Sequence, residues 1–143
     1  MQAPVTAAPL AGRTLGTAES SFVIAEWRDG GSPSPAAPRY LAPLHVHHQD
    51  DEAWYVLEGT LCVLSGGEEI VAPAGSAVFV PRGKGHTFWN PGPGPVRYLL
   101  LMTPRIFALI QAIHALAERS RPSLEAVFAR YDSELLDFPS ERG

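Results

Sequence analysis

Residues 44–59 read LHVHHQDDEAWYVLEG, and this stretch decides how the rest of the chain is interpreted. It begins and ends with runs that favour β-strands, and a polar Gln-Asp-Asp turn separates the two runs. Side chains two apart on a strand share a face. We therefore expect His45 and His47 to point one way and His48 the other, while Glu52 opens the next strand.

A second informative stretch, GSAVFVPRGKGHTFWN, covers residues 75–90 and places His86 at the start of another expected strand. Three imidazoles and one carboxylate converging from three strands would suit a first-row transition metal, because imidazole binds Zn, Cu, Fe and Ni and a carboxylate adds an oxygen ligand. The sequence alone thus indicates a candidate metal site at His45, His47, Glu52 and His86.

Short strands separated by turns are expected through the first hundred residues. The chain has 13 Gly and 14 Pro, and because each one inside a helix costs about 1 to 3 kcal/mol, an all-helical fold is excluded. Strand spacing of roughly 8 to 12 residues indicates a sandwich or barrel. The expected strands are Ser21–Trp27, Leu44–His48, Ala53–Leu57, Thr60–Leu64, Glu69–Ala72, Ala77–Val80, His86–Trp89 and Val96–Met102, with an irregular loop over Ser32–Pro38.

The pattern becomes helical after Thr103, which is a suitable N-cap followed by Pro104 in the first turn. An apolar stripe of Ile106, Ile110 and Ile113 then recurs at helical spacing. Ser123 is expected to cap a second short helix. These features divide the chain into a loose tail over residues 1–14, a β-barrel over 15–102 and a helical extension over 103–143.

Composition excludes several classes of protein. The net charge of −4 gives no electrostatic basis for nucleic-acid binding. No apolar run approaches the roughly 18 to 20 residues that span a bilayer, so no membrane partner is expected. The single cysteine excludes an internal disulfide framework. Because the first residues lack the charged start of a secretory signal, we expect a cytoplasmic protein.

The two quoted stretches resemble the paired motifs of the cupin superfamily. The first motif is His-x-His, four residues, Glu, six residues and Gly, found here at His45, His47, Glu52 and Gly59. The second is Gly, five residues, Pro-x-Gly, two residues, His, three residues and Asn, found here at Gly75, Pro81, Gly83, His86 and Asn90. The C-terminal helices resemble those of small single-domain cupins described as quercetin-dioxygenase-like. One departure is Arg39, which stands where the first motif usually has glycine.

The resemblance implies an all-β fold, a cupin-type antiparallel β-barrel or jelly roll with a short C-terminal helical tail. It also implies that His45, His47, Glu52 and His86 are ligands of one divalent transition metal per chain, which could be Fe, Zn, Mn, Ni or Cu. Glu52 is in addition the candidate catalytic residue, because a carboxylate that leaves the metal could act as a base.

Four further residues are candidates for the wall of a substrate pocket. Trp54 and Val56 share the strand parity of Glu52, and Phe88 and Asn90 share that of His86. Core packing explains the apolar three equally well, and Asn90 could instead cap the Pro-Gly turn that follows it. His48, on the opposite face of its strand, is expected at the surface or outside the ligand shell.

The expected function is that of a metal-dependent oxidoreductase, a dioxygenase-type enzyme for a small enol- or phenol-like substrate. One alternative is a zinc-type polyketide cyclase or isomerase, in which the metal polarises a carbonyl. Another is a cupin that binds a small molecule without catalysis. A homodimer is also expected, because barrel edges and the Ile106, Ile110 and Ile113 stripe need covering surfaces.

Overall fold

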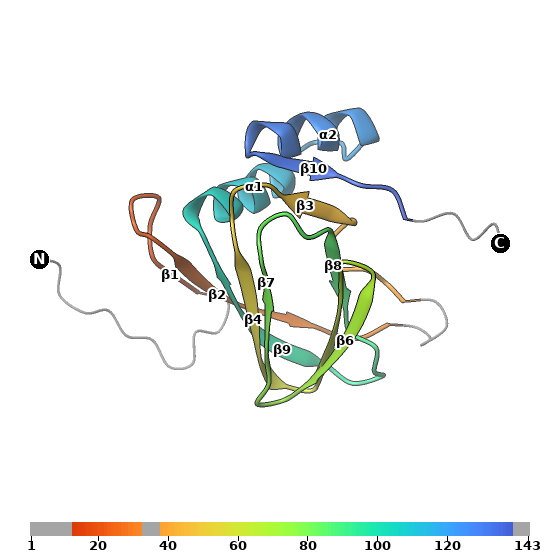
Figure 1. The fold of residues 1–143 in the computed structure, drawn as a ribbon. Helices are drawn as coiled ribbons and strands as arrows, with labels where there is room; N and C mark the ends of the chain where they lie inside the picture. The colour runs from red at the N-terminus through yellow and green to blue at the C-terminus, as the bar shows by residue number, and fades with distance from the viewer. Residues whose placement is uncertain (1–12, 33–37, 139–143) are drawn as a thin grey trace, which may run out of the picture.

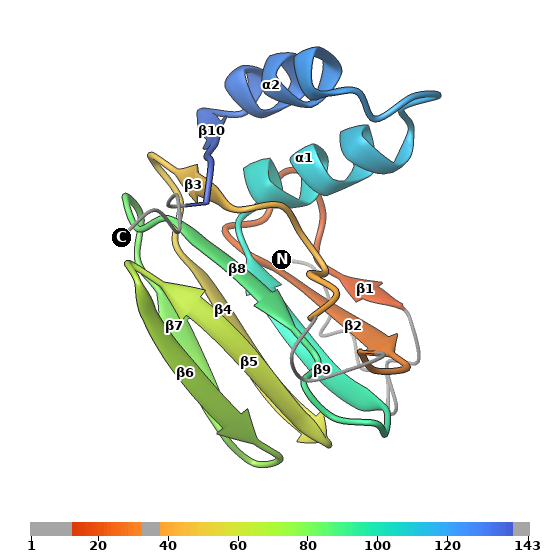
Figure 2. The ribbon, with the colours of Figure 1, turned by 90° about the vertical axis from the view of Figure 1, so that its right-hand side faces the viewer.

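The computed structural model describes residues 13–32 and 38–138. These residues form two antiparallel sheets that enclose a core, with two helices lying across one end of the barrel (Figures 1 and 2). The expected jelly-roll fold is thus confirmed. Residues 1–12 of the expected tail and 33–37 of the expected loop lie outside the described residues.

Each sheet has five strands. The first has the order β1 (Thr14–Leu15), β2 (Val23–Asp29), β9 (Val96–Met102), β4 (Glu52–Glu58) and β7 (Ala77–Val80). The second has the order β10 (Ser133–Leu135), β3 (His45–His47), β8 (His86–Trp89), β5 (Thr60–Ser65) and β6 (Glu68–Pro73). Consecutive strands therefore alternate between the sheets over much of the chain, as a jelly roll requires.

The core lies between the sheets and follows the alternation of the strands. On β9, every second side chain is buried, namely Val96, Tyr98, Leu100 and Met102. Trp54 and Val56 of the adjacent strand β4 are fully buried against them. The remaining volume is filled from the second sheet, by Leu61 and Val63 of β5 and by Phe88 of β8.

Glycine is required at the corner between β4 and β5. Gly59 has a φ of 78°, and a Cβ added there would lie 2.3 Å from the carbonyl oxygen of Pro95. The left-handed backbone conformation disfavours any residue with a Cβ atom, and the nearby carbonyl oxygen leaves no room for one. The glycine of the first motif thus serves the path of the backbone at the far end of β4 from Glu52.

Two helices follow the barrel. Helix α1 (Pro104–His114) is capped by Thr103 as expected, whose hydroxyl accepts a hydrogen bond from Ile106 N at 3.2 Å. Helix α2 (Arg121–Arg130) is capped by Ser120 and not, as expected, by Ser123. The expectation was wrong because proline is compatible with the first turn of a helix, so Pro122 lies inside the helix and does not precede it. No helix in the described part of the chain has the length and apolarity needed to cross a membrane.

The apolar stripe of α1 is covered by the chain itself. Ile106 is buried in the barrel core, Ile110 packs against that core, and Ile113 packs against a smaller cluster formed with α2. The stripe therefore gives no support to the expected homodimer, which stays a prediction. The extension after Met102 is also not only helical, because β10 joins the second sheet beside β3. At the other end, β1 begins at Thr14, one residue inside the expected tail.

Candidate metal centre

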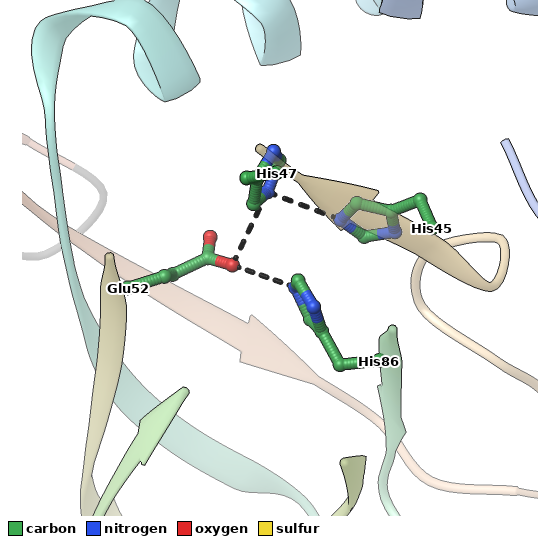
Figure 3. Close-up of side chains that lie close together, drawn as sticks. All are labelled: His45, His47, Glu52 and His86. Carbon is green, nitrogen blue, oxygen red and sulfur yellow. Dashed lines mark hydrogen bonds and ion pairs between the residues drawn. The ribbon is translucent and has the colours of Figure 1, made fainter. Parts of the chain in front are cut away.

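Four side chains of the expected metal site converge at the end of the barrel covered by the helices. His45 and His47 come from β3, Glu52 opens β4 and His86 opens β8. Their ligand atoms all lie within 4.8 Å of one another, and all four residues are buried (Figure 3). His45 Nε2 lies 3.2 Å from His47 Nε2, and Glu52 Oε1 lies 2.9 Å from His86 Nε2 and 3.5 Å from His47 Nε2.

The local backbone explains why these residues meet. Strands β3 and β8 are paired at His45 and His86, so these two side chains stand side by side. The loop before β8 is fixed by Gly83, whose φ of 84° suits glycine and whose backbone N–H donates to the His47 carbonyl at 2.8 Å. Gly83 of the second motif thus links, through this hydrogen bond, the segment of His45 and His47 to the segment of His86.

Each imidazole has a polar partner outside the cluster. The Nδ1 atom of His45 lies 2.6 Å from the Pro43 carbonyl oxygen, and that of His86 lies 3.0 Å from the Lys84 carbonyl oxygen. The Nδ1 atom of His47 lies 2.7 Å from the Ser133 hydroxyl oxygen. All three rings therefore direct Nε2 toward the centre, the arrangement in which outer partners orient metal ligands.

The charges of the cluster suit a cation. Burial raises the pKa of Glu52, but hydrogen bonds and charge interactions with His47 and His86 outweigh burial and lower this pKa to about 2. Burial, followed by the neighbouring imidazoles of His86 and His47, lowers the pKa of His45 to about 3. Among the described residues, no lysine or arginine forms an ion pair with Glu52. A buried carboxylate beside imidazole nitrogens, with no permanent cation, is a donor set that fits a divalent transition metal.

A cavity of about 270 Å³ opens beside the cluster. Three of the four cluster residues, His45, His47 and Glu52, lie on its wall. Most of the remaining wall is apolar or aromatic, and the charged members lie where the cavity meets solvent. The other lining residues are Trp27, Arg28, Asp29, Leu41, Ala42, Pro43, Phe88, Tyr98, Leu100, Ile106, Leu109, Ile110, Ile113, His114, Arg119 and Phe128.

Comparison with known proteins agrees with this geometry. Residues 37–102 match the cupin domain family Cupin_2, and that segment contains all four cluster residues. The fold also resembles that of a sugar phosphate isomerase of the cupin superfamily from Silicibacter pomeroyi, with a TM-score of 0.50 and 26% identity. Residues 37–102 of this chain form a cupin domain.

The relatives of this cupin match it over part of their length. The tetracenomycin polyketide synthase protein TcmJ from Streptomyces glaucescens is 35% identical over 68 residues, which are 48% of this chain and 46% of that protein. The isomerase match covers 59% of this chain and 51% of the isomerase. The protein TT1209 from Thermus thermophilus has a TM-score of 0.50 and 26% identity over 59% of this chain and 73% of that one. The chain thus spans about half the length of the first two. The quercetin-dioxygenase-like resemblance stays a prediction.

The four residues expected in the substrate pocket lie in different surroundings in the structure. Phe88 lines the cavity, whereas Trp54 and Val56 lie in the core of the cupin barrel and are not among the lining residues. Asn90 caps a turn: its Nδ2 donates to the Gly94 carbonyl at 2.8 Å and its Oδ1 accepts from Gly92 N at 3.0 Å. The proline-glycine turn after β8 therefore uses both ends of this amide.

His48 lies outside the cluster, as expected. Its side chain is 48% exposed, and Nε2 lies 3.4 Å from Glu134 Oε1 at the surface. In the turn before Glu52, Asp51 forms an ion pair with Arg82, while Asp50 is buried beside Arg105. His48, the residue after β3, thus points away from the cluster, as the sequence predicted.

Several cavity residues were not anticipated as site residues. Tyr98 and Leu100 face inward with the alternation of β9, a signal that the sequence carried but that does not distinguish a cavity wall from core. The isoleucine stripe of α1 is also visible in the sequence, and the structure places its residues on the wall of the cavity. Phe128 of α2, whose ring centroid lies 5.3 Å from that of His45, had no sequence signal that linked it to the site.

Proposed function

We propose that this cupin is a metal-dependent enzyme that acts on a small, largely apolar substrate bearing an enol or phenol oxygen, in a dioxygenase-type reaction. The observation that carries the proposal is the position of His45, His47 and Glu52 on the wall of an apolar cavity. A closed structural site buries its metal behind protein ligands, whereas a catalytic site leaves a position open to substrate. A cavity of about 270 Å³ beside the ligands supports the second kind.

The residues of the cluster have separate proposed roles. His45, His47, Glu52 and His86 would hold the metal, and a redox-active ion such as iron would supply the electron transfer between substrate and dioxygen. Glu52 is ionised at neutral pH because its pKa lies at about 2. Its Oε1 contacts His47 and His86, and the second oxygen, which has no contact drawn in Figure 3, is proposed to accept the proton of the substrate hydroxyl.

The cavity wall would orient the substrate and exclude water. Aromatic rings of Trp27, Phe88, Tyr98 and Phe128 lie around the cavity, which suits a planar or unsaturated body. Exclusion of water protects reactive species from hydrolysis, which favours an oxygenation.

The rim of the cavity indicates where a charged end of the substrate would lie. Arg28, His114 and Arg119 are exposed lining residues. The carboxylate of Asp29, also at the rim, is already in an ion pair with Arg39 at 2.6 Å. A substrate with an anionic group at the end distant from the metal is therefore favoured.

A second candidate is a redox-neutral cyclisation or isomerisation. The similarity to a tetracenomycin polyketide synthase protein favours it, because a polyketide carries many enolisable carbonyl groups on an apolar frame. The sugar phosphate isomerase gives a weaker argument, since the wall around the cluster is mainly apolar. In this reaction a bound metal would act as a Lewis acid toward a carbonyl.

Metal analysis and dioxygen uptake test the proposal. Protein purified without oxygen is analysed for its metal content, and the loaded protein is then given enols, phenols and polyketide-like diketones while dissolved dioxygen is recorded. Substrate-dependent uptake with both oxygen atoms in the product supports the dioxygenase. Conversion without uptake supports the cyclase or isomerase instead. Tight binding of a candidate without conversion would indicate the binding module, and Glu52→Gln serves as the inactive control in each assay.

A further inference from the structure

The chain segment that follows the barrel returns to the metal centre. Strand β10 lies beside the ligand strand β3 (Figure 2). The two strands pair with Ser133 opposite His47, Glu134 opposite Val46 and Leu135 opposite His45. Directly opposed residues of an antiparallel pair project from the same face of the sheet. The side chain of Ser133 therefore lies on the side of β3 that carries the cluster histidines.

The Ser133 hydroxyl connects this segment to one imidazole. Ser133 is buried, and its Oγ lies 2.7 Å from His47 Nδ1 and 3.1 Å from the carbonyl oxygen of Tyr131. A hydroxyl has one proton to donate, and a carbonyl oxygen accepts only. The Ser133 proton is therefore directed to Tyr131, and Oγ accepts a hydrogen bond from His47 Nδ1–H.

This direction of donation fixes the tautomer of His47. A neutral imidazole has one protonated nitrogen and one nitrogen with a free lone pair. With the proton on Nδ1, the lone pair of His47 is on Nε2, the atom that faces Glu52 and His45. Only this tautomer can bind a metal at the centre of the cluster.

His47 differs from the other two histidines in the source of its partner. The carbonyls of Pro43 and Lys84, each two residues from the histidine it contacts, hold His45 and His86. These are main-chain groups that side-chain substitution does not remove. The partner of His47 is a side chain that comes 86 residues later in the sequence.

The neighbouring contacts keep Ser133 in place. Asp132, which precedes it, has a φ of 52° and accepts a hydrogen bond on its carbonyl from His48 N at 2.9 Å. Arg105 of α1 forms ion pairs with the side chains of both Asp132 and Asp50. The turn between α2 and β10 is thus attached to β3 and to the turn before Glu52.

We propose that Ser133 is a positioning residue of the metal centre, which holds His47 in the tautomer and ring orientation that metal binding requires. It does so from the C-terminal extension, so this extension is part of the centre although it lies outside the matched cupin domain at residues 37–102. The inference rests on the proposed metal site and concerns the affinity of that site.

Replacement of the hydroxyl tests this role. Ser133→Ala is titrated with Co(II) and Zn(II), and the ¹⁵N chemical shifts of the His47 ring are measured in the metal-free protein. Loss of an outer hydrogen bond to a ligand typically lowers metal affinity by about 10- to 100-fold, and we expect a loss in this range. We also expect the ¹⁵N shifts to move from the Nδ1-protonated form toward a mixture of tautomers.

Two further substitutions separate the hydroxyl from packing. Ser133→Thr keeps the hydroxyl. Ser133→Val has nearly the same shape as threonine but no hydroxyl. The pair stays informative if Ser133→Ala does not fold. We expect Ser133→Thr to bind metal more tightly than Ser133→Val by about tenfold or more. Glu134→Gln, at an exposed position on the same strand, is the matched control and should bind like the wild type.

The outcomes distinguish this inference from the proposed function. Wild-type protein that binds no transition metal overturns the metal centre and the role of Ser133 together. A wild-type protein that binds metal, with Ser133→Ala binding equally well and keeping the same His47 ¹⁵N shifts, overturns only the role of Ser133. Equal loss of affinity in the threonine and valine variants also overturns it, because packing and not the hydroxyl would then be the cause.

Discussion

Neighbouring histidines at the end of β3 allow a direct test of the metal centre, because His47→Ala removes a side chain from the buried cluster and His48→Ala removes the same kind of side chain from the surface. His47 is buried with Nε2 directed at Glu52, whereas His48 is 48% exposed and its partner Glu134 is 63% exposed. An exposed pair of this kind contributes at most about 1 kcal/mol to stability. His48→Ala should therefore change little, and His47→Ala should remove a metal ligand.

The size of the effect follows from linkage between metal binding and unfolding. At a metal concentration about 1,000 times Kd, binding raises the free energy of unfolding by about 4.1 kcal/mol. Loss of a direct ligand should weaken binding more than loss of an outer contact, hence by more than about 100-fold. The same metal concentration then stabilises His47→Ala by no more than about 1.4 kcal/mol.

The measurement is urea denaturation of each variant with and without metal, together with metal stoichiometry. We expect the wild type and His48→Ala to show the same metal-induced stabilisation and His47→Ala to lose most of it. The opposite result, an empty site in His48→Ala and a full one in His47→Ala, would refute the strand parity. The assignments of Glu52 and His86 would be refuted with it.

Three further predictions concern pH, the cavity and assembly. The pKa of His45 is lowered to about 3 in the folded chain, so the unfolded chain binds more protons below about pH 6.5. The metal-free protein should therefore lose about 1 kcal/mol of unfolding free energy per pH unit as the pH falls from about 6.5 to 5. Urea titrations measure this loss, and an unchanged slope in His45→Gln would contradict the assignment. Ile110→Trp should fill the cavity and abolish turnover while metal content stays at the wild-type level, and retained turnover would show that substrate binds elsewhere. A homodimer is expected from the exposed barrel edges, and light scattering that gives the 15.4 kDa monomer at micromolar concentration would exclude it.

The sequence predicted best those features that depend on the spacing of residues along one strand or within one motif. Two-residue periodicity separated His45 and His47 from His48, and motif spacing brought Glu52 and His86 to the same cluster. Strand parity also assigned Trp54 and Val56 to the inward face correctly. It did not give their depth along the barrel axis.

Depth explains why those two residues are core and not pocket. The cluster occupies one end of the barrel, where Glu52 is the first residue of β4 and His86 the first of β8. Trp54 and Val56 lie farther along β4, between the sheets, where they are fully buried in the core. Parity repeats along a whole strand, whereas a cavity extends over part of it.

The contribution of the C-terminal extension could not be predicted for a different reason. Strand β10 has three residues, too few for a periodic pattern, and its pairing with β3 joins residues far apart in sequence. The hydrogen bond from His47 to Ser133 depends on that pairing. A serine in a short polar segment has no feature that distinguishes it from a turn residue before the fold is known.

The order in which these parts are synthesised has a consequence for how the protein acquires its metal. The ribosome adds roughly 5 to 20 residues per second, so the four cluster residues emerge several seconds before β10. During that interval β3 lacks its edge partner, and His47 can exchange freely between tautomers because Ser133 is not yet beside it. A nascent chain would therefore hold a metal ion more weakly until β10 has paired with β3. The metal found in the cell would then reflect the ions available after this pairing more than those encountered earlier in translation.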